Sequence, residues 1–206
     1  INMTSHKYKF FYIFLFILFI SYNVSADEKV EHRIAVFVNE EIITSYDIVQ
    51  RLKLNAIMQN ININSQNNQL MINNAVDQLI QEKLKSEKIN EYKIQVDDDE
   101  YLDFETDFFN RNSIDKSQLL LLLSDNNIDY QNLRELLIGE LSWNKLISGL
   151  YYRITSVGDL EINEILEKNP NISIKQAENL VIQRQLDLQS SKLLRDMMNE
   201  ATIEYR

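Results

Sequence analysis

Seven carboxylates within eleven residues form the densest group of reactive side chains in the sequence. They are Asp97, Asp98, Asp99, Glu100, Asp103, Glu105 and Asp107. A calcium-binding loop has alternating oxygen ligands, a glycine at its sharp turn and a closing glutamate. Here the first four carboxylates are consecutive and no glycine interrupts them. Because acidic side chains interact favourably with the positive end of a helix dipole, the group fits a solvated helix start better than a metal site.

Other groups that catalyse reactions are scarce. The sequence has two histidines, His6 and His32, both ahead of the predicted folded body, and no cysteine. Its glycines, Gly139, Gly149 and Gly158, are too scattered for a phosphate-binding loop. The sequence therefore predicts a protein that is not an enzyme and that needs no metal or cofactor.

The first 26 residues have the three parts of a secretory signal. A short basic stretch at 6–9 precedes an apolar run at 10–22, and the small residues of 24–26 follow. This pattern predicts cleavage between Ala26 and Asp27, and therefore export. The alternative is a retained anchor, but the 13 residues of the apolar run are fewer than the ~20 that span a bilayer. We expect membrane contact only if this segment is retained.

Charge and composition narrow the possible partners. Removal of residues 1–26 takes away two lysines and changes the net charge from −10 to −12. This acidity argues against nucleic acid as a partner, because nucleic-acid binding requires a basic patch, and against charge-driven docking on anionic lipid.

Only three glycines and one proline occur in the sequence. Since sheet-rich proteins need many turn residues, this scarcity favours a helical fold.

The elements follow from apolar spacing and from capping residues. A hairpin is predicted at 34–43, and Thr44 and Asp47 have the spacing of a capping box before a helix at 45–58. Further helices are predicted at 69–89, from the acidic run through 101–109, around 119–123, and at 130–152, 159–168 and 173–200, with a strand at 203–205. We expect one domain over 27–206, with an N-terminal part at 33–168 and a C-terminal part at 173–206. Residues expected to face inward include Leu70, Leu180 and Leu188.

Large apolar side chains are more abundant than any catalytic group. They can be read as core packing or as an adaptable groove for unfolded chain segments. The five consecutive leucines at 119–123 cover more than one helix face, so some of them are expected to be exposed or to meet a neighbour. The candidate groove residues are Leu52, Met58, Tyr101, Phe104, Phe108, Trp143, Tyr151 and Met197.

The order of these elements resembles the SurA family of periplasmic chaperones. The segment IAVFVNEEIITSYDI at 34–48 looks like the entry motif of that family, and 94–102 and 129–134 are similar to its later steps. The resemblance covers most of 34–206. It implies a mainly α fold, a SurA/trigger-factor C-terminal-like helical chaperone core. A small antiparallel sheet would form from the N-terminal hairpin and the C-terminal strand.

The sequence departs from many family members at one place. Those members carry parvulin-type prolyl-isomerase domains, of about a hundred residues each, before the C-terminal segment. Here only 169–172 lie in that place, and the mature body has neither the parvulin histidines nor a cysteine. The resemblance therefore implies a chaperone without isomerase activity, in the periplasm of a Gram-negative bacterium. It would hold unfolded outer-membrane proteins without ATP, in a groove between the N-terminal helices and the last helix. The alternatives are an adaptor for one folded partner and an isomerase with an unrecognised site.

Overall fold

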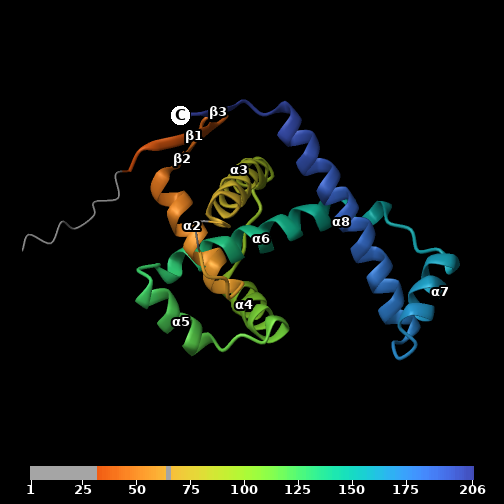
Figure 1. Ribbon diagram of the computed structural model, residues 1–206. Helices are drawn as coiled ribbons and strands as arrows, with labels where there is room; N and C mark the ends of the chain where they lie inside the picture. The colour runs from red at the N-terminus through yellow and green to blue at the C-terminus, as the bar shows by residue number, and fades with distance from the viewer. Residues whose placement is uncertain (1–31, 64–65) are drawn as a thin grey trace, which may run out of the picture. The chain divides into compact units, whose positions relative to one another are not determined.

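The N-terminal hairpin and the C-terminal residues form one three-stranded antiparallel sheet (Figure 1). The computed structural model describes residues 32–63 and 66–206, so the predicted signal and its cleavage after Ala26 lie outside the described residues. The strands are β1 (Ile34–Val38), β2 (Glu41–Thr44) and β3 (Ile203–Tyr205), in the order β2-β1-β3. The pairing of β3 with β1 confirms the predicted closure of the sheet by the C-terminal strand.

Asn39 makes the hairpin turn and fastens it to the C-terminal segment. Its φ of 51° is left-handed, and Glu40 is not among the residues with positive φ, so the turn needs no glycine there. The Asn39 N–H donates to the Thr202 carbonyl at 2.9 Å, and the Thr202 N–H donates to Asn39 Oδ1 at 3.0 Å. The same side chain that allows the turn therefore also holds the start of β3.

Seven α-helices and one 3₁₀ helix make up most of the described chain. They are α2 (Ser45–Met58), α3 (Asn68–Glu91), α4 (Asp98–Asn112), α5 (Lys116–Asp125), α6 (Tyr130–Tyr151), η2 (Tyr152–Ile154), α7 (Asp159–Lys168) and α8 (Ile174–Glu200). Capping boxes begin three of them, at Thr44, Asp97 and Ser173. In each box two otherwise unpaired N–H groups gain partners, which fixes where the helix starts. The mainly α fold with a small antiparallel sheet is confirmed.

Three apolar clusters hold these elements together. In the first, α2, α4, α5 and α6 meet around Leu133 and Leu137, which are fully buried. In the second, the inner face of the sheet packs on Ile80 and Leu84 of α3. In the third, Trp143 and its neighbours on α6 pack against α8. The long helices α3, α6 and α8 therefore connect the clusters, and residues 32–206 form one unit.

Between α6 and α8 the chain forms η2 and α7, and α7 packs along α8 (Figure 1). We call residues 152–188, which include α7 and the first half of α8, the arm. Ala177 and Val181 are buried but belong to none of the three clusters, whereas Ile182 and Leu186 pack with the third cluster around α6. Helix α8 therefore uses two different faces along its length, and α7 itself has no buried residue.

Three residues predicted to face inward are exposed instead. Leu70 is 64% exposed in the first turn of α3, and Leu180 and Leu188 are 47% and 62% exposed on α8. Each of the latter two lies two residues from a side chain packed with the third cluster, and thus on the opposite side of the helix. Apolar spacing identified the helix correctly, but it could not tell which of its faces a neighbour covers.

The five leucines of α5 divide as expected between core and surface. Leu119 and Leu123, one turn apart, are 4% and 1% exposed in the first cluster. The three leucines between them are exposed. One helix face therefore anchors α5, and the other lies on the surface.

Candidate functional site

A cavity of about 820 Å³ lies among α2, α3 and α6. The connector between α3 and α4 contributes Ile94 and Val96 to it, and α8 contributes Ser190. Other apolar side chains in its wall are Leu54, Leu79, Ile89, Leu136 and Ile138. Its volume is within the range of small-molecule and peptide side-chain pockets. The cavity is therefore large enough for a few side chains of a bound chain.

An ion pair bridges α2 and α3 at the cavity. Arg51 is 8% exposed, and its two terminal nitrogens donate to the two carboxylate oxygens of Glu82, with Nη2 to Oε2 at 2.8 Å. This paired arrangement fixes both side chains. Gln50, next to Arg51, donates to the Asn127 carbonyl at 3.4 Å. Arg51 and Glu82 therefore join α2 to α3, and Gln50 joins α2 to the segment between α5 and α6.

Lys85 of α3 and Trp143 of α6 both line the cavity and contact each other. Trp143 is 3% exposed, and its Nε1 donates to Ser190 Oγ at 2.8 Å, which ties α6 to α8. Lys85 Nζ lies 5.6 Å from the centroid of the indole ring, within cation–π range. Burial lowers the pKa of Lys85, an effect that the nearby Glu82 and Glu140 carboxylates oppose. Within the part of the chain that the structure describes, Lys85 makes no ion pair.

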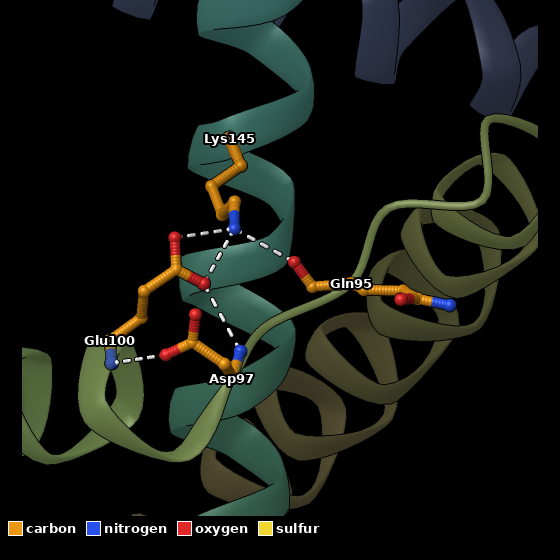
Figure 2. A network of polar contacts seen from close by, with 4 residues as sticks. All are labelled: Gln95, Asp97, Glu100 and Lys145. Carbon is orange, nitrogen blue, oxygen red and sulfur yellow. Dashed lines mark hydrogen bonds and ion pairs between the residues drawn. The ribbon is translucent and has the colours of Figure 1, made fainter.

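A lysine of α6 holds the connector that forms one wall of the cavity. Figure 2 shows Lys145 Nζ donating to both carboxylate oxygens of Glu100, at 2.6 Å each, and to the Gln95 carbonyl at 2.7 Å. Glu100 also closes the capping box by accepting from the Asp97 N–H at 3.1 Å. The predicted acidic helix start therefore also joins α4 to α6, because its Glu100 carboxylate binds Lys145.

The Lys145–Glu100 contact is expected to make stability depend on pH. The pKa of Glu100 lies below its usual range, chiefly because Lys145 donates to its carboxylate and next because the Asp97 N–H does. A carboxyl with a lowered folded-state pKa adds stability above its unfolded pKa and loses it as pH falls through the folded value. Lys145→Met is therefore expected to raise the pKa of Glu100 toward its ordinary value. It is also expected to reduce the loss of unfolding free energy between about pH 6 and about pH 3.

Carboxyl NMR titration and urea unfolding at the two pH values measure these changes. Glu100→Gln is expected to show the same reduced pH dependence. Lys168→Met, which removes the surface partner of Glu164 on α7, serves as the control and is expected to leave the pKa of Glu100 unchanged. An unchanged pKa of Glu100 in Lys145→Met contradicts the assignment.

Gly139 lines the cavity in the middle of α6. A Cβ atom at this position would meet nothing within 4 Å, and the backbone there is not left-handed. Glycine in a helix interior costs about 0.5–1 kcal/mol relative to alanine. The packing of the described residues does not require this glycine, so the open space in front of it is available to a ligand.

The arm carries a group of exposed apolar side chains. Ile154, Val157, Leu160 and Leu188 are 68%, 37%, 85% and 62% exposed, and we call them the arm patch. The Ser156 N–H donates to Gln185 Oε1 at 3.0 Å, and Gln185 Nε2 donates back to the Ser156 carbonyl at 2.6 Å. These bonds hold Ser156 beside Gln185, which lies three residues before Leu188 on α8. The arm patch therefore consists of exposed apolar side chains on two segments that meet at Gln185.

The eight predicted groove residues are not brought together at one surface. Leu52, Tyr101 and Trp143 are buried at 9%, 5% and 3% exposure. Met58, Phe104 and Phe108 pack at the edge of the first cluster, and Tyr151 and Met197 at the edge of the third. Among the eight, Trp143 alone lines the cavity. Core packing thus accounts for their positions, and client binding by them stays a prediction.

Sequence reasoning did not identify the polar residues of the cavity or the arm patch. Arg51 and Glu82 belong to helices whose apolar residues were used to predict the core, and their pairing depends on how α2 meets α3. Gly139 offered a signal, since a glycine inside an otherwise strong helix costs stability relative to alanine. Leu160 offered one too, because it lies two residues before Ile162 and so on the opposite side of α7 from the apolar residues at 162, 165 and 166.

Two further searches cover the described residues alone. Among residues 32–63 and 66–206, no group of three or more His, Cys, Asp or Glu side chains is placed to hold a metal ion. Within these same ranges, no helix combines the length and the hydropathy that a membrane span requires.

Comparisons with known proteins agree with the fold. Residues 2–147 match the family described as the SurA-like N-terminal domain. A solved structure from work on PEB4 and Cj1289, two SurA-like chaperones of Campylobacter jejuni, matches with a TM-score of 0.51 at 16% sequence identity. The match covers 84% of this chain and 99% of that chain. No curated protein sequence matches.

Proposed function

Because the chain belongs to the SurA-like N-terminal domain family, we propose that it is a chaperone that holds unfolded outer-membrane proteins without ATP. The observation that carries the proposal is the arm patch, in which four apolar side chains are exposed on two segments that the Ser156–Gln185 hydrogen bonds join. Exposed apolar groups of this kind are typical of surfaces that bind other chains. The patch lies on the arm, where α7 packs along α8 and η2 packs against α6.

Binding at such a surface is driven by burial of apolar area and needs no nucleotide. Burying apolar surface contributes about 25 cal/mol per Å², so a few exposed side chains give weak binding that many client sequences can share. The net charge of −10, or −12 without residues 1–26, keeps a loaded chaperone soluble by repulsion between its copies. We place the protein in the periplasm of a Gram-negative bacterium, in keeping with the export signal predicted at 1–26.

Aggregation of an unfolded outer-membrane protein, followed by light scattering, tests this function. The wild-type chain is expected to delay aggregation at a near-equimolar ratio. The double variant Leu160→Ser/Leu188→Ser removes two exposed leucines of the arm patch and is expected to lose most of the delay. Loss of both apolar contacts from a weak interface is expected to reduce client affinity about tenfold or more.

Leu70→Ser/Leu102→Ser is the matched control. These two leucines are 64% and 53% exposed on α3 and α4, so the chemical change and the cost to the fold are similar. The control is expected to delay aggregation as the wild type does. Equal activity of the two double variants contradicts the arm patch as the client surface, and no delay by the wild type contradicts the chaperone function.

We also propose that the chain does not catalyse prolyl isomerisation. Between α6 and α8 the chain has only η2, α7 and their connectors, far less than the length of a parvulin-type domain. A proline-peptide isomerisation assay at micromolar protein is expected to show no rate above background. Crosslinking to many unfolded clients, rather than to one stoichiometric partner, separates the chaperone from an adaptor for a folded protein.

A further inference from the structure

We propose that the cavity among α2, α3 and α6 binds an extended peptide segment that places an acidic side chain on Lys85 and an apolar side chain in front of Gly139. The identity of the bound chain as an unfolded client rests on the proposed function, whereas the chemistry of the site rests on the cavity alone. The cavity is separate from the arm patch, since none of the four patch residues lines it.

The cavity lining carries four carboxylates and three cations, and one of these cations, Lys85, is placed to bind an acidic ligand. Arg51 and Glu82 satisfy each other, Lys83 pairs with Glu41 at 3.2 Å, and Asp47 accepts from Thr44 at the start of α2. Glu135 and Glu140 are exposed, so water solvates them. Lys85 alone among the cavity's charged groups is both partly removed from water and without an ion pair in the described ranges. A carboxylate that reaches it gains a charge-assisted hydrogen bond in a partly desolvated site.

Space and apolar surface lie beside that charge. The wall formed by Leu79, Leu136 and Ile138 is apolar, and a Cβ atom added at Gly139 would meet nothing within 4 Å. In an extended chain, residues i and i+2 point to the same side, about 7 Å apart. A segment with an apolar residue two positions from a glutamate therefore presents both groups to the same wall.

An internal acidic side chain fits a holding function better than a chain terminus. An unfolded client contains many glutamates and aspartates but a single terminal carboxylate. A site that recognises the side chain is therefore available along the whole client. Since the chaperone is strongly acidic as a whole, attraction to such a segment has to come from a local cation such as Lys85.

Fluorescence anisotropy with short labelled peptides tests the site directly. The probe is a peptide of sequence Gly-Ser-Leu-Thr-Glu-Ser-Gly, acetylated and amidated at its ends, compared with its Glu-to-Gln form. The wild-type chain is expected to bind the Glu form about tenfold more tightly at low salt, and the difference is expected to shrink as salt is added. Lys85→Gln is expected to abolish the difference. Lys192→Gln, which removes an exposed lysine of α8 outside the cavity, is expected to keep it.

Two glycines of α6 provide a matched steric pair. Gly139→Leu fills the cavity and is expected to weaken binding of both peptides at least tenfold. Gly149→Leu adds the same side chain to open space outside the cavity and is expected to bind as the wild type does. Both variants replace a helical glycine with a better helix former, so both are expected to be at least as stable as the wild type in urea unfolding.

The outcomes separate this site from the proposed function. Equal binding of the two peptides by the wild type, or wild-type binding by Gly139→Leu, overturns the cavity proposal even if the chain delays aggregation. Selective peptide binding by a chain that does not delay aggregation supports the site and overturns the chaperone function. Binding of only a Gln-form peptide with a free terminal carboxylate overturns the assignment to a side chain.

Discussion

Replacement of Trp143 with alanine is expected to lower the free energy of unfolding by about 3–5 kcal/mol, because it removes a large buried side chain and leaves a cavity. Trp143 is 3% exposed and packs with Leu146, Ile147 and Leu186 between α6 and α8. It is the only tryptophan in the sequence. Urea unfolding followed by far-ultraviolet circular dichroism, which does not depend on indole fluorescence, measures the change.

Ser190→Ala separates the hydrogen bond from the packing. This variant removes the acceptor of Trp143 Nε1 and retains the indole, so it is expected to cost about 1 kcal/mol. The effect of Trp143→Ala is therefore expected to be several times that of Ser190→Ala. Similar losses in the two variants contradict tight packing of the indole between the helices.

Replacement of Lys116 with methionine is expected to lower the free energy of unfolding by about 3 kcal/mol, because it leaves a buried carboxylate without its cation. Glu105 is 4% exposed inside the first cluster. Lys116 Nζ donates to its Oε2, and the Tyr101 hydroxyl donates to its Oε1 at 2.7 Å. Burial, the bond to Glu105 and its charge raise the pKa of Tyr101, so the hydroxyl keeps its proton at neutral pH. In Lys116→Met, the Glu105 carboxylate therefore keeps the neutral Tyr101 hydroxyl as a donor but loses its cation.

The double variant Lys116→Met/Glu105→Leu tests this explanation. Removing both charges leaves no unpaired carboxylate, and the Tyr101 hydroxyl keeps the Tyr130 hydroxyl at 3.2 Å as a partner. The double variant is therefore expected to recover most of the loss in urea unfolding. Lys168→Met, at an exposed pair on α7, is expected to change the unfolding free energy by less than about 0.5 kcal/mol. A double variant as unstable as Lys116→Met contradicts the electrostatic explanation.

The parts of the fold that the sequence predicted are those that local chemistry determines. The capping box of Thr44 and Asp47 begins α2 where expected, and the alternating residues at 203–205 form a strand. The hairpin formed without glycine because only Asn39 takes the left-handed conformation. In each case the information lies within a few neighbouring residues.

The candidate sites depended on contacts that no local pattern contains. Tyr101 and Leu52 are as apolar or aromatic as a groove residue would be, but both are buried, Tyr101 among the helices of the first cluster. Leu188 has the spacing of a core residue, but it lies on the side of α8 opposite Leu186, which packs with the third cluster, and it is 62% exposed. Apolar spacing indicates which residues share a helix face, whereas exposure depends on which of the faces a neighbouring helix covers.

The pairing of β3 with β1 links folding to the order of synthesis. Between Val38 and Ile203, which are partners in the sheet, lie 164 residues. At about 5–20 residues per second, the ribosome adds them over about 10–30 s. During that time β1 has one open edge, and the hairpin is a two-stranded ribbon of marginal stability that can pair with other chains. The nascent protein therefore passes through a stage in which β1 has a row of unpaired backbone groups, a property it shares with the unfolded clients that we propose it holds.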